Sequence, residues 1–199
     1  MAIRINTGWC RGLTLKNPPT LHTRPTASRI RESAWNSLQF DLQDSIVLDL
    51  FGGSGAVGIE AISRGARELA LVDNSQEAVR CLNYNVKQVY KRSLGRSIQP
   101  KLSVWCEDAT NFLSKQKPSK FDIIWIDPPY SQVNYLCAEL ARLAYNCLVP
   151  GGKVIFEYDE YGFETIEQIR KSSIWHDKRH KRYGKIYITI LEKLESSHE

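Results

Sequence analysis

A glycine-rich loop directly after an apolar run is the feature that most restricts how this chain can fold. Residues 46–51 read IVLDLF, and Gly53, Gly55 and Gly58 follow with the spacing G-x-G-x-x-G. Glycines allow a sharp turn and a close approach to a bound group. The helix that begins after the loop directs its N–H groups at an anion, and Asp73, about 20 residues on, suits a ribose diol. The loop therefore predicts a site for an adenosine-containing cofactor.

From residue 46 onward, apolar runs alternate with helical stretches. The predicted strands are 46–51, 69–73, 101–105, 121–127 and 153–158, and the predicted helices lie near 56–64, 75–92, 109–116, 131–147 and 164–170. Strands without polar alternation are typical of a parallel sheet that is covered on both faces. We therefore predict an α/β fold with a doubly wound, mostly parallel, Rossmann-like sheet.

Both ends of the chain depart from this alternation. AIRIN and GLTLK predict an N-terminal β-hairpin, and residues 25–40 have helical spacing, with an apolar face formed by Ile30, Ala34, Trp35 and Leu38. The segment 174–194 predicts two antiparallel strands around the basic turn KRYGK. We expect an N-terminal extension, 1–40, and a catalytic domain, 41–199, that together form one compact unit.

Size and cysteine usage exclude several classes of protein. A chain of 199 residues suits one domain, and no apolar run reaches the ~18 residues of a membrane span. The five cysteines are scattered without a C-x-x-C pair, so neither a disulfide framework nor a zinc site is expected. His176 and His180 have the spacing of a metal pair but lie among cations, so we predict no metal. We expect a cytoplasmic monomer without membrane association.

A second motif narrows the chemistry. Asp127, Pro128, Pro129 and Tyr130 end the predicted strand 121–127, and ligands of such sheets bind beyond the carboxyl ends of the strands. If this strand neighbours 46–51, the motif and the glycine loop face one crevice. The lone pair of an aromatic amine is delocalised into the ring, so the amine is a poor nucleophile. Asp127 and the carbonyl of Pro128 can each accept a hydrogen bond from one of its N–H groups. This geometry favours a pyramidal nitrogen whose lone pair points towards an incoming methyl group. Tyr130 can stack on the base, a contact of ~1–3 kcal/mol.

This arrangement serves methyl transfer to the exocyclic amine of a base. S-adenosylmethionine already carries an activated methyl group, so the protein adds mainly positioning and electrostatics. The glycine loop alone also fits NAD, which leaves an NAD-dependent oxidoreductase as an alternative. A non-catalytic RNA-binding module is a further alternative.

Longer motifs carry a resemblance to a known family. They are IRINTGWCRG at 3–12, RPTASRIRESAWN at 24–36, LDLFGGSGAVGIEA at 48–61, VD at 72–73 and IDPPY at 126–130. The chain resembles class I S-adenosylmethionine-dependent methyltransferases, and among them the 16S ribosomal RNA guanine-N2 methyltransferases of the RsmD type. Trp35, in place of the more usual Phe, and a longer basic loop, 91–101, depart from the family pattern.

The resemblance implies roles for particular residues. The cofactor would be bound by Asp49, Gly52, Gly53, Ser54, Gly55, Asp73, Asn74, Asp108 and Ala109. Asp49 and the loop 52–55 would hold its amino-acid moiety, Asp73 would hold its ribose, and Asp108 would lie near its adenine amine. Asp127, Pro128, Pro129 and Tyr130 would be catalytic. The implied reaction is methylation of a guanine N2 amine in small-subunit ribosomal RNA, with an adenine-N6 methyltransferase on DNA or RNA as the alternative, because DPPY suits either amine.

The formal charge of +5 is concentrated at the two ends of the chain. Candidate RNA-binding residues are Arg4, Arg11, Arg24, Arg29 and Arg31 near the N-terminus, and Lys178, Arg179, Lys181, Arg182 and Lys185 near the C-terminus. Arg29 and Arg31 could instead reach the carboxylate of the cofactor. Cations interleaved with rings are typical of surfaces that bind phosphates and stack bases. Residues 130–153 leave no room for a DNA-recognition insert, which favours structured RNA, as ribosomal RNA or an assembling small ribosomal subunit.

Overall fold

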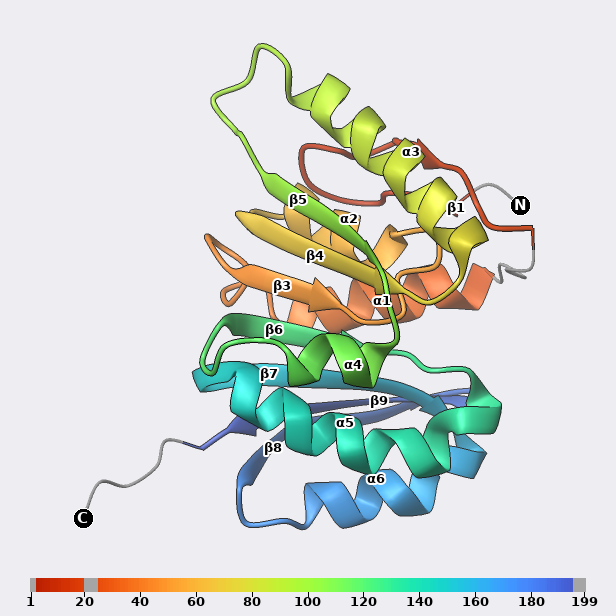
Figure 1. Ribbon diagram of the computed structural model, residues 1–199, viewed down its shortest axis with the longest axis vertical. Coiled ribbons are helices and arrows are strands. Elements are labelled where there is room, and N and C mark those ends of the chain that lie inside the picture. Colours follow the sequence, from red (N-terminus) through yellow and green to blue (C-terminus); the bar gives the residue numbers. More distant parts are fainter. Residues whose placement is uncertain (1–2, 20–24, 195–199) are drawn as a thin grey trace. The chain divides into compact units, whose positions relative to one another are not determined.

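The computed structural model describes residues 3–19 and 25–194. The chain divides into two compact units, Met1–Asp108 and Ala109–Glu199. The sequence did not indicate a boundary at this point, and the predicted N-terminal extension belongs with residues 41–108 in the first unit. Figure 1 shows the elements of both units, which are described separately below.

Three parallel strands form the centre of the first unit, in the order β5-β4-β3. They are β3 (Ile46–Asp49), β4 (Glu68–Asp73) and β5 (Lys101–Cys106), joined through α2 (Ala56–Ser63) and α3 (Gln76–Ser93). Strands β3 and β4 are almost wholly buried, as their apolar sequences predict. Strand β5 is partly exposed along its length, so it is less covered than the parallel-sheet pattern predicts.

The N-terminal hairpin and helix form as predicted. Strands β1 (Ile3–Arg4) and β2 (Thr14–Leu15) pair antiparallel over two residues each, and α1 spans Pro25–Ser37. The predicted apolar face is buried: Ile30, Ala34, Trp35 and Leu38 are each at most 3% exposed.

The turn of this hairpin is docked on the last turn of α2. The backbone N–H and the indole N–H of Trp9 donate to the carbonyl oxygens of Ser63 and Ile62, each at 2.9 Å. Gly8 has φ +74°, and a Cβ there would lie 1.7 Å from the Ser63 carbonyl oxygen. Only glycine fits this contact. The helix that follows the glycine loop therefore carries the N-terminal extension.

A buried ion pair strengthens the same attachment. The Glu60 side chain of α2 is fully buried and accepts hydrogen bonds from Arg31 Nε at 2.8 Å, Arg64 Nη2 at 3.0 Å and Thr7 Oγ1 at 3.1 Å. Arg31 also donates to the carbonyl oxygen of Arg4 at 3.1 Å. Removing one partner of such a buried pair costs about 3–5 kcal/mol, because the other charge stays buried.

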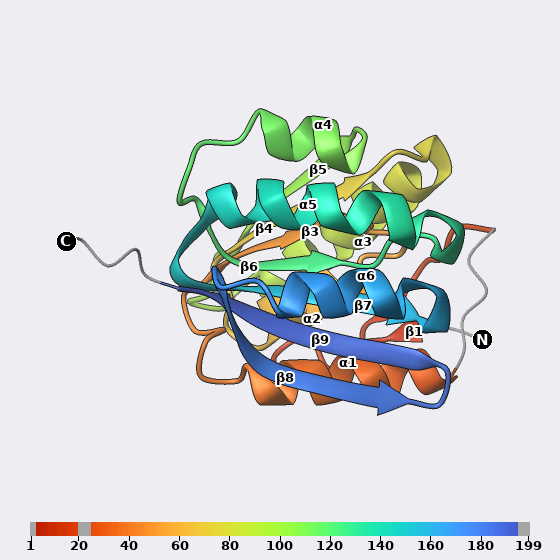
Figure 2. The same ribbon diagram turned by 90° about the horizontal axis from the view of Figure 1, so that it is seen from below.

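The second unit contains four strands in the order β6-β7-β9-β8. Its elements are α4 (Ala109–Ser114), β6 (Phe121–Ile126), η1 (Tyr130–Gln132), α5 (Val133–Cys147), β7 (Leu148–Asp159), η2 (Glu160–Gly162), α6 (Phe163–Arg170), β8 (Trp175–Tyr183) and β9 (Ile186–Lys193). Strands β6 and β7 are parallel, and β9 pairs antiparallel with both β7 and β8. Figure 2 shows this hairpin with α5 and α6 over the strands.

The predicted turn between the last two strands is a two-residue loop of Gly184 and Lys185. Gly184 has φ +64°, as the first position of a type II′ turn requires. Strand β7 begins at Leu148, five residues before the predicted start, because Leu148 already pairs with Phe121 of β6. The register then shifts past Gly151 (φ +72°), and pairing resumes between Ile123 and Lys153. Parallel strands that end in an antiparallel pair confirm the predicted fold class. No helix in the described parts of the chain is long and apolar enough to cross a membrane.

Candidate active site

The glycine loop and Asp73 meet at the carboxyl ends of the strands in the first unit. Gly53 and Gly55 have φ of +51° and +79°, a left-handed region that favours glycine. The N–H of Gly53 donates to Asp73 Oδ2 at 2.9 Å, and the N–H of Ser75 donates to Asp73 Oδ1 at 2.9 Å. The two features that the sequence suggested for cofactor binding are therefore in direct contact.

No side chain caps the start of α2. Gly55 is its N-cap and offers no side-chain acceptor to the first turn. In that turn the N–H of Gly58 donates to Asp49 Oδ2 at 3.2 Å. Helix N-termini of this kind favour negatively charged ligands.

Asp49 lies beneath the loop rather than on its surface. It is 1% exposed. The pKa of its carboxyl is raised to about 7, because the raising effects of burial and of the Asp73 charge outweigh the lowering effect of the Gly58 N–H. The resemblance implied that Asp49 holds the amino-acid moiety of the cofactor. Its burial and its bond to Gly58 indicate that it supports the loop and the first turn of α2.

The remaining residues of this edge fit a nucleoside. Each oxygen of Asp73 uses one lone pair for a backbone N–H and keeps another for a ribose hydroxyl. Asn74 is exposed, Asp108 is partly exposed and Ala109 is buried. The N–H of Glu107 donates to the Asp73 carbonyl oxygen at 3.2 Å, which holds the segment before Asp108 beside Asp73. The left-handed glycines, the α2 N-terminus and Asp73 thus fit an adenosine cofactor.

Sequence reasoning missed Asn85, which ties the glycine loop to the N-terminal hairpin. Its side chain is fully buried. Nδ2 donates to the carbonyl oxygens of Ser54 and Lys16, and Oδ1 accepts from the N–H of Lys16, all at 2.8 Å. The available signal was an amide on the buried face of α3, among Ala78, Cys81, Leu82, Val86 and Val89.

The DPPY motif follows the carboxyl end of β6 in the second unit. Asp127 is partly exposed, Pro128 is buried and Tyr130 is 42% exposed. The N–H of Gln132 donates to the Pro129 carbonyl oxygen at 2.8 Å, which fixes the turn into η1. Within the described residues, no hydrogen bond uses the carbonyl of Pro128. The turn is therefore rigid and presents an exposed ring.

Asp127 acts electrostatically on the neighbouring helix. Burial, and after it the charge of Asp127, together raise the pKa of the Cys137 thiol in α5 to about 12. Cys137 is therefore a neutral thiol beside the carboxylate.

Of the N-terminal RNA-binding candidates, Arg4, Arg11 and Arg29 are exposed, and Arg24 lies outside the described residues. Arg31 is a correction. It is 5% exposed, with its guanidinium bound to Glu60 and to the Arg4 carbonyl oxygen. That burial is inconsistent with the expected contact to RNA or cofactor, and Arg31 instead holds α1 on α2.

The C-terminal candidates lie on the β8–β9 hairpin. Lys178, Lys181, Arg182 and Lys185 are exposed, and Arg179 is partly exposed. Lys181 lies over the Tyr183 ring at 5.0 Å from its centroid, and Arg182 lies over the Tyr187 ring at 5.4 Å. Lys178 is partly neutralised by Glu192, 3.5 Å away.

His180 is used within the hairpin. Its Nδ1 lies 2.9 Å from Thr189 Oγ1, and its ring stacks on Tyr187 at 5.7 Å between centroids. Burial, followed by Arg170, lowers the pKa of its imidazole. No group of three or more metal-ligating side chains occurs among the residues that were described.

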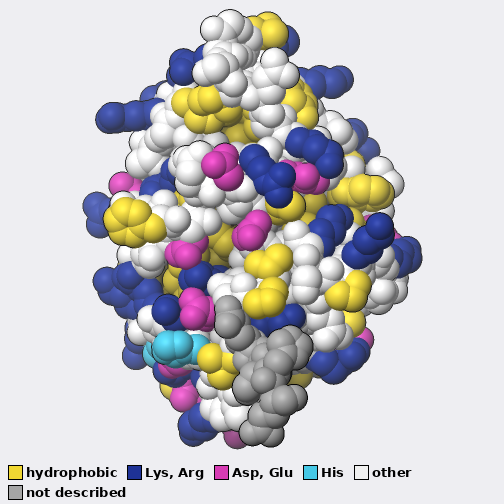
Figure 3. All heavy atoms as spheres, turned by 90° about the vertical axis from the view of Figure 1, so that its left-hand side faces the viewer, with side chains coloured by type: hydrophobic (Ala, Val, Ile, Leu, Met, Phe, Trp, Pro, Cys, Tyr) yellow, Lys and Arg dark blue, Asp and Glu magenta, His cyan; other side chains and the backbone are white. Residues whose placement is uncertain are grey.

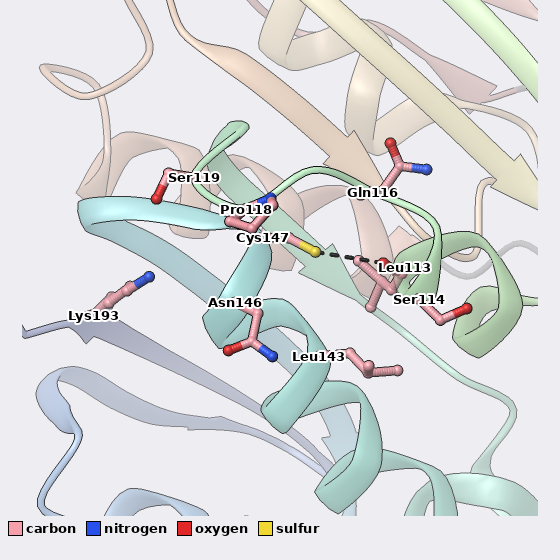
Figure 4. A pocket seen from close by; sticks show the side chains of 9 residues that line it. All are labelled: Leu113, Ser114, Gln116, Pro118, Ser119, Leu143, Asn146, Cys147 and Lys193. Carbon is pink, nitrogen blue, oxygen red and sulfur yellow. Dashed lines mark hydrogen bonds between the residues drawn. The ribbon is translucent and has the colours of Figure 1, made fainter.

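A hollow of about 360 Å³ lies at the amino end of β6, the end away from the DPPY motif (Figure 4). It is lined by Leu113, Ser114, Gln116, Pro118, Ser119, Leu143, Asn146, Cys147 and Lys193. Lys193 Nζ donates to the carbonyl oxygens of Tyr145 and Leu148, each at 2.8 Å, and so caps the end of α5. Because Asp127 follows the carboxyl end of β6 and this hollow lies at its amino end, the hollow is not the site at DPPY.

Comparison with known proteins agrees with this geometry. A family model described as "Conserved hypothetical protein 95" matches residues 3–192. The chain belongs to this family. A relative from Buchnera aphidicola subsp. Acyrthosiphon pisum, "Ribosomal RNA small subunit methyltransferase D", is 36% identical over 177 residues, 88% of this chain and 81% of the relative. The resemblance to RsmD-type methyltransferases is thereby confirmed.

Solved structures of other proteins share the fold of this chain. A putative methyltransferase from Escherichia coli, yhhF, has a TM-score of 0.77 and 26% identity, and the match covers 98% of this chain and 100% of that chain. A putative methyltransferase complexed with SAH has a TM-score of 0.68 at 14% identity, covering 85% of this chain and 50% of that chain. The chain is a methyltransferase of the class I fold.

Proposed function

We propose that this chain transfers a methyl group from S-adenosylmethionine to the exocyclic N2 amine of a guanine in small-subunit ribosomal RNA. The observation that carries the proposal is the DPPY turn at the carboxyl end of β6, where Asp127 is partly exposed and no hydrogen bond among the described residues uses the Pro128 carbonyl. The name of the Buchnera relative supports a small-subunit ribosomal RNA substrate. We expect the enzyme to act as a cytoplasmic monomer on free RNA or on an assembling subunit.

All but one of the residues proposed to bind the cofactor lie in the first unit, and the exception, Ala109, follows Asp108 directly in the chain. The left-handed glycine loop and the N-terminus of α2 suit the amino-acid moiety, and Asp73 suits the ribose diol. Asn74, Asp108 and Ala109 would surround the adenine. When bound, S-adenosylmethionine supplies a methyl group on a positively charged sulfur.

The substrate amine would be held by DPPY. The carboxylate of Asp127 and the carbonyl oxygen of Pro128 each accept a hydrogen bond from one N–H of the amine. These two bonds favour a pyramidal nitrogen, whose lone pair points out of the plane of the base. As the nitrogen would bond to the methyl carbon, the carbon–sulfur bond would break, and the positive charge gained by the nitrogen would be stabilised by the Asp127 carboxylate until the nitrogen loses one proton. Tyr130 stacks on the base and fixes its plane. Pro128 and Pro129 fix φ and so hold these acceptors in place.

RNA would be bound by exposed cations of both units. In the first unit they are Arg4, Arg11 and Arg29, and in the second they are Lys178, Arg179, Lys181, Arg182 and Lys185. Rings beneath Lys181 and Arg182 offer stacking surfaces to unpaired bases.

An adenine-N6 methyltransferase is the second candidate, because the two acceptors of DPPY fit either amine. Nucleoside mass spectrometry of 16S RNA, from cells with and without this protein, separates the two. Loss of one N2-methylguanine supports the proposal, whereas loss of an N6-methyladenine replaces it with the alternative. An unchanged set of methylated nucleosides contradicts both.

A further inference from the structure

Two stretches of the chain without any acidic residue come together in the first unit. Residues 1–31 and residues 78–106 contain no Asp or Glu. The second stretch covers most of α3, the loop that follows it and β5, and it carries Arg80, Lys87, Lys91, Arg92, Arg96 and Lys101. Near the top of Figure 3, where the loop after α3 lies, the charged side chains in view are Lys and Arg.

Direct contacts join the hairpin to α3 and its loop. Arg92 Nη2 donates to the carbonyl oxygen of Arg11 at 2.7 Å. The guanidinium of Arg96 lies over the Trp9 ring, 5.9 Å from its centroid. Nearer the start of the helix, Lys16 Nζ lies 5.6 Å from the centroid of the Tyr84 ring. Cations and rings therefore follow α3 from Tyr84 to the loop, about 14 Å of helix at ~1.5 Å per residue.

The charges of this face are not neutralised. Lys16, Lys87, Lys91, Arg92 and Arg96 are exposed, and within residues 3–19 and 25–194 none of them forms an ion pair. The hydrogen bond of Arg92 goes to a neutral carbonyl, which leaves its charge available.

Stabilisation of α3 accounts for only some of the cations on this face. Cations in the last turn of α3, Lys91 and Arg92, complement the helix dipole. Lys16 and Arg96 lie outside the helix, and Lys87 precedes its last turn. Repulsion between these like charges is relieved when a polyanion binds.

We propose that Lys16, Lys87, Lys91, Arg92 and Arg96 form a second RNA-binding surface, which holds the phosphate backbone of RNA flanking the modified nucleotide. This inference rests on the proposed RNA substrate. Lys91, Arg92 and Arg96 belong to the basic loop 91–101 noted in the sequence, and the structure adds Lys16, Lys87 and the rings of Trp9 and Tyr84 to them. Trp9 and Tyr84 support two of the cations and present ring faces to unpaired bases. Phosphate contacts of this kind orient a substrate without reading its sequence.

The test compares Arg92→Gln/Arg96→Gln with the matched control Lys117→Gln/Lys171→Gln, which removes two exposed cations of the second unit. Binding to 16S RNA and to a short stem-loop that holds only the target nucleotide is measured against salt concentration. With 16S RNA, the Arg variant should bind roughly 10-fold or more weakly at 0.1 M salt, and the slope of log K against log salt should become shallower by about 1.8. Binding of the stem-loop should change less than twofold.

Because Arg92 contacts Arg11, a second variant, Lys87→Gln/Lys91→Gln, removes charge without removing a hydrogen bond, and it should reproduce the shallower slope. Thermal unfolding and binding of S-adenosylhomocysteine should match the wild type in all variants. A slope on 16S RNA equal to that of the control overturns the inference. An equal loss on the stem-loop overturns the assignment to flanking RNA. Should the wild type methylate no RNA, the proposed function fails, whereas a methylating wild type with unaffected Arg and Lys variants refutes only this surface.

Discussion

The backbone N–H of Gly53 donates to Oδ2 of Asp73 across 2.9 Å. This bond joins the loop after β3 to the residue that ends β4. The acceptor proposed for the ribose therefore also holds the loop proposed for the amino-acid moiety. Loss of Asp73 should act on both parts of the cofactor site.

Replacement of Asp73 by Ala should weaken binding of S-adenosylhomocysteine by about 10- to 100-fold, because hydrogen bonds to a charged group contribute about 1.5–3 kcal/mol. Isothermal titration calorimetry measures this directly. Glu77→Ala removes an exposed acid from the first turn of α3 and serves as the control. Binding by the Asp73 variant within twofold of the wild type would remove this residue from the cofactor site.

Asn85→Leu should lower the free energy of unfolding by about 2–4 kcal/mol, because it leaves the buried Ser54 carbonyl and the partly buried backbone groups of Lys16 without this partner. Asn83→Leu, on the exposed face of the same helix, should change it by less than about 0.5 kcal/mol. Urea denaturation compares the two variants. Equal stabilities would show that Asn85 does not anchor the hairpin and the loop.

The pKa of Asp49, raised to about 7 by burial, predicts a particular dependence of stability on pH. The unfolded state releases this proton near pH 4 and the native state near pH 7, so the native state binds more protons in between. Stability should therefore fall as pH rises from about 4 to 7, by at most about 1.4 kcal/mol per pH unit.

Asp49→Asn keeps an oxygen for the Gly58 N–H and removes the titration. The difference in unfolding free energy between wild type and variant, measured across this pH range, isolates the contribution of Asp49. A difference that does not change with pH would show that the Asp49 carboxyl is ionised in the native state.

The strand, helix and turn pattern was predictable because local signals agree with the fold. The apolar runs at 46–51 and 69–73, the glycines at 53 and 55 and the Gly184 turn each specify local geometry. Contacts between distant segments were not predictable in this way. Nothing beside Arg31 in the sequence indicates Glu60 as its partner, so its charge suggested RNA although its position is buried.

The contacts of Asn85, and those between the cations of α3 and the N-terminal hairpin, could not be predicted for a related reason. The amphipathic pattern of α3 places Asn85 on the buried face, but only the folded chain shows the backbone groups of residues 16 and 54 that it binds. The cations after Lys87 could be counted in the sequence, but their contact with Trp9 and Arg11 depends on the docked hairpin.

Charge reversal at Lys181 and Arg182 should weaken binding to 16S RNA and make its salt dependence shallower, because both exposed cations lie on the proposed RNA-binding hairpin. Filter binding over a range of salt concentrations measures the slope. Lys117→Glu/Lys171→Glu carries the same change in charge as a control. A slope equal to that of the control would place the hairpin outside the RNA-binding surface.

Methyl transfer by Asp127→Asn reports on the proposed role of this carboxylate, because the amide keeps the size of the side chain but removes the charge that stabilises the amine. Transfer of labelled methyl groups to 16S RNA from a strain that lacks this protein gives the rate, and calorimetry gives the affinity for S-adenosylhomocysteine. We predict that kcat falls by at least about 100-fold while that affinity stays within about twofold of the wild type. Methylation at the wild-type rate would contradict the role assigned to Asp127.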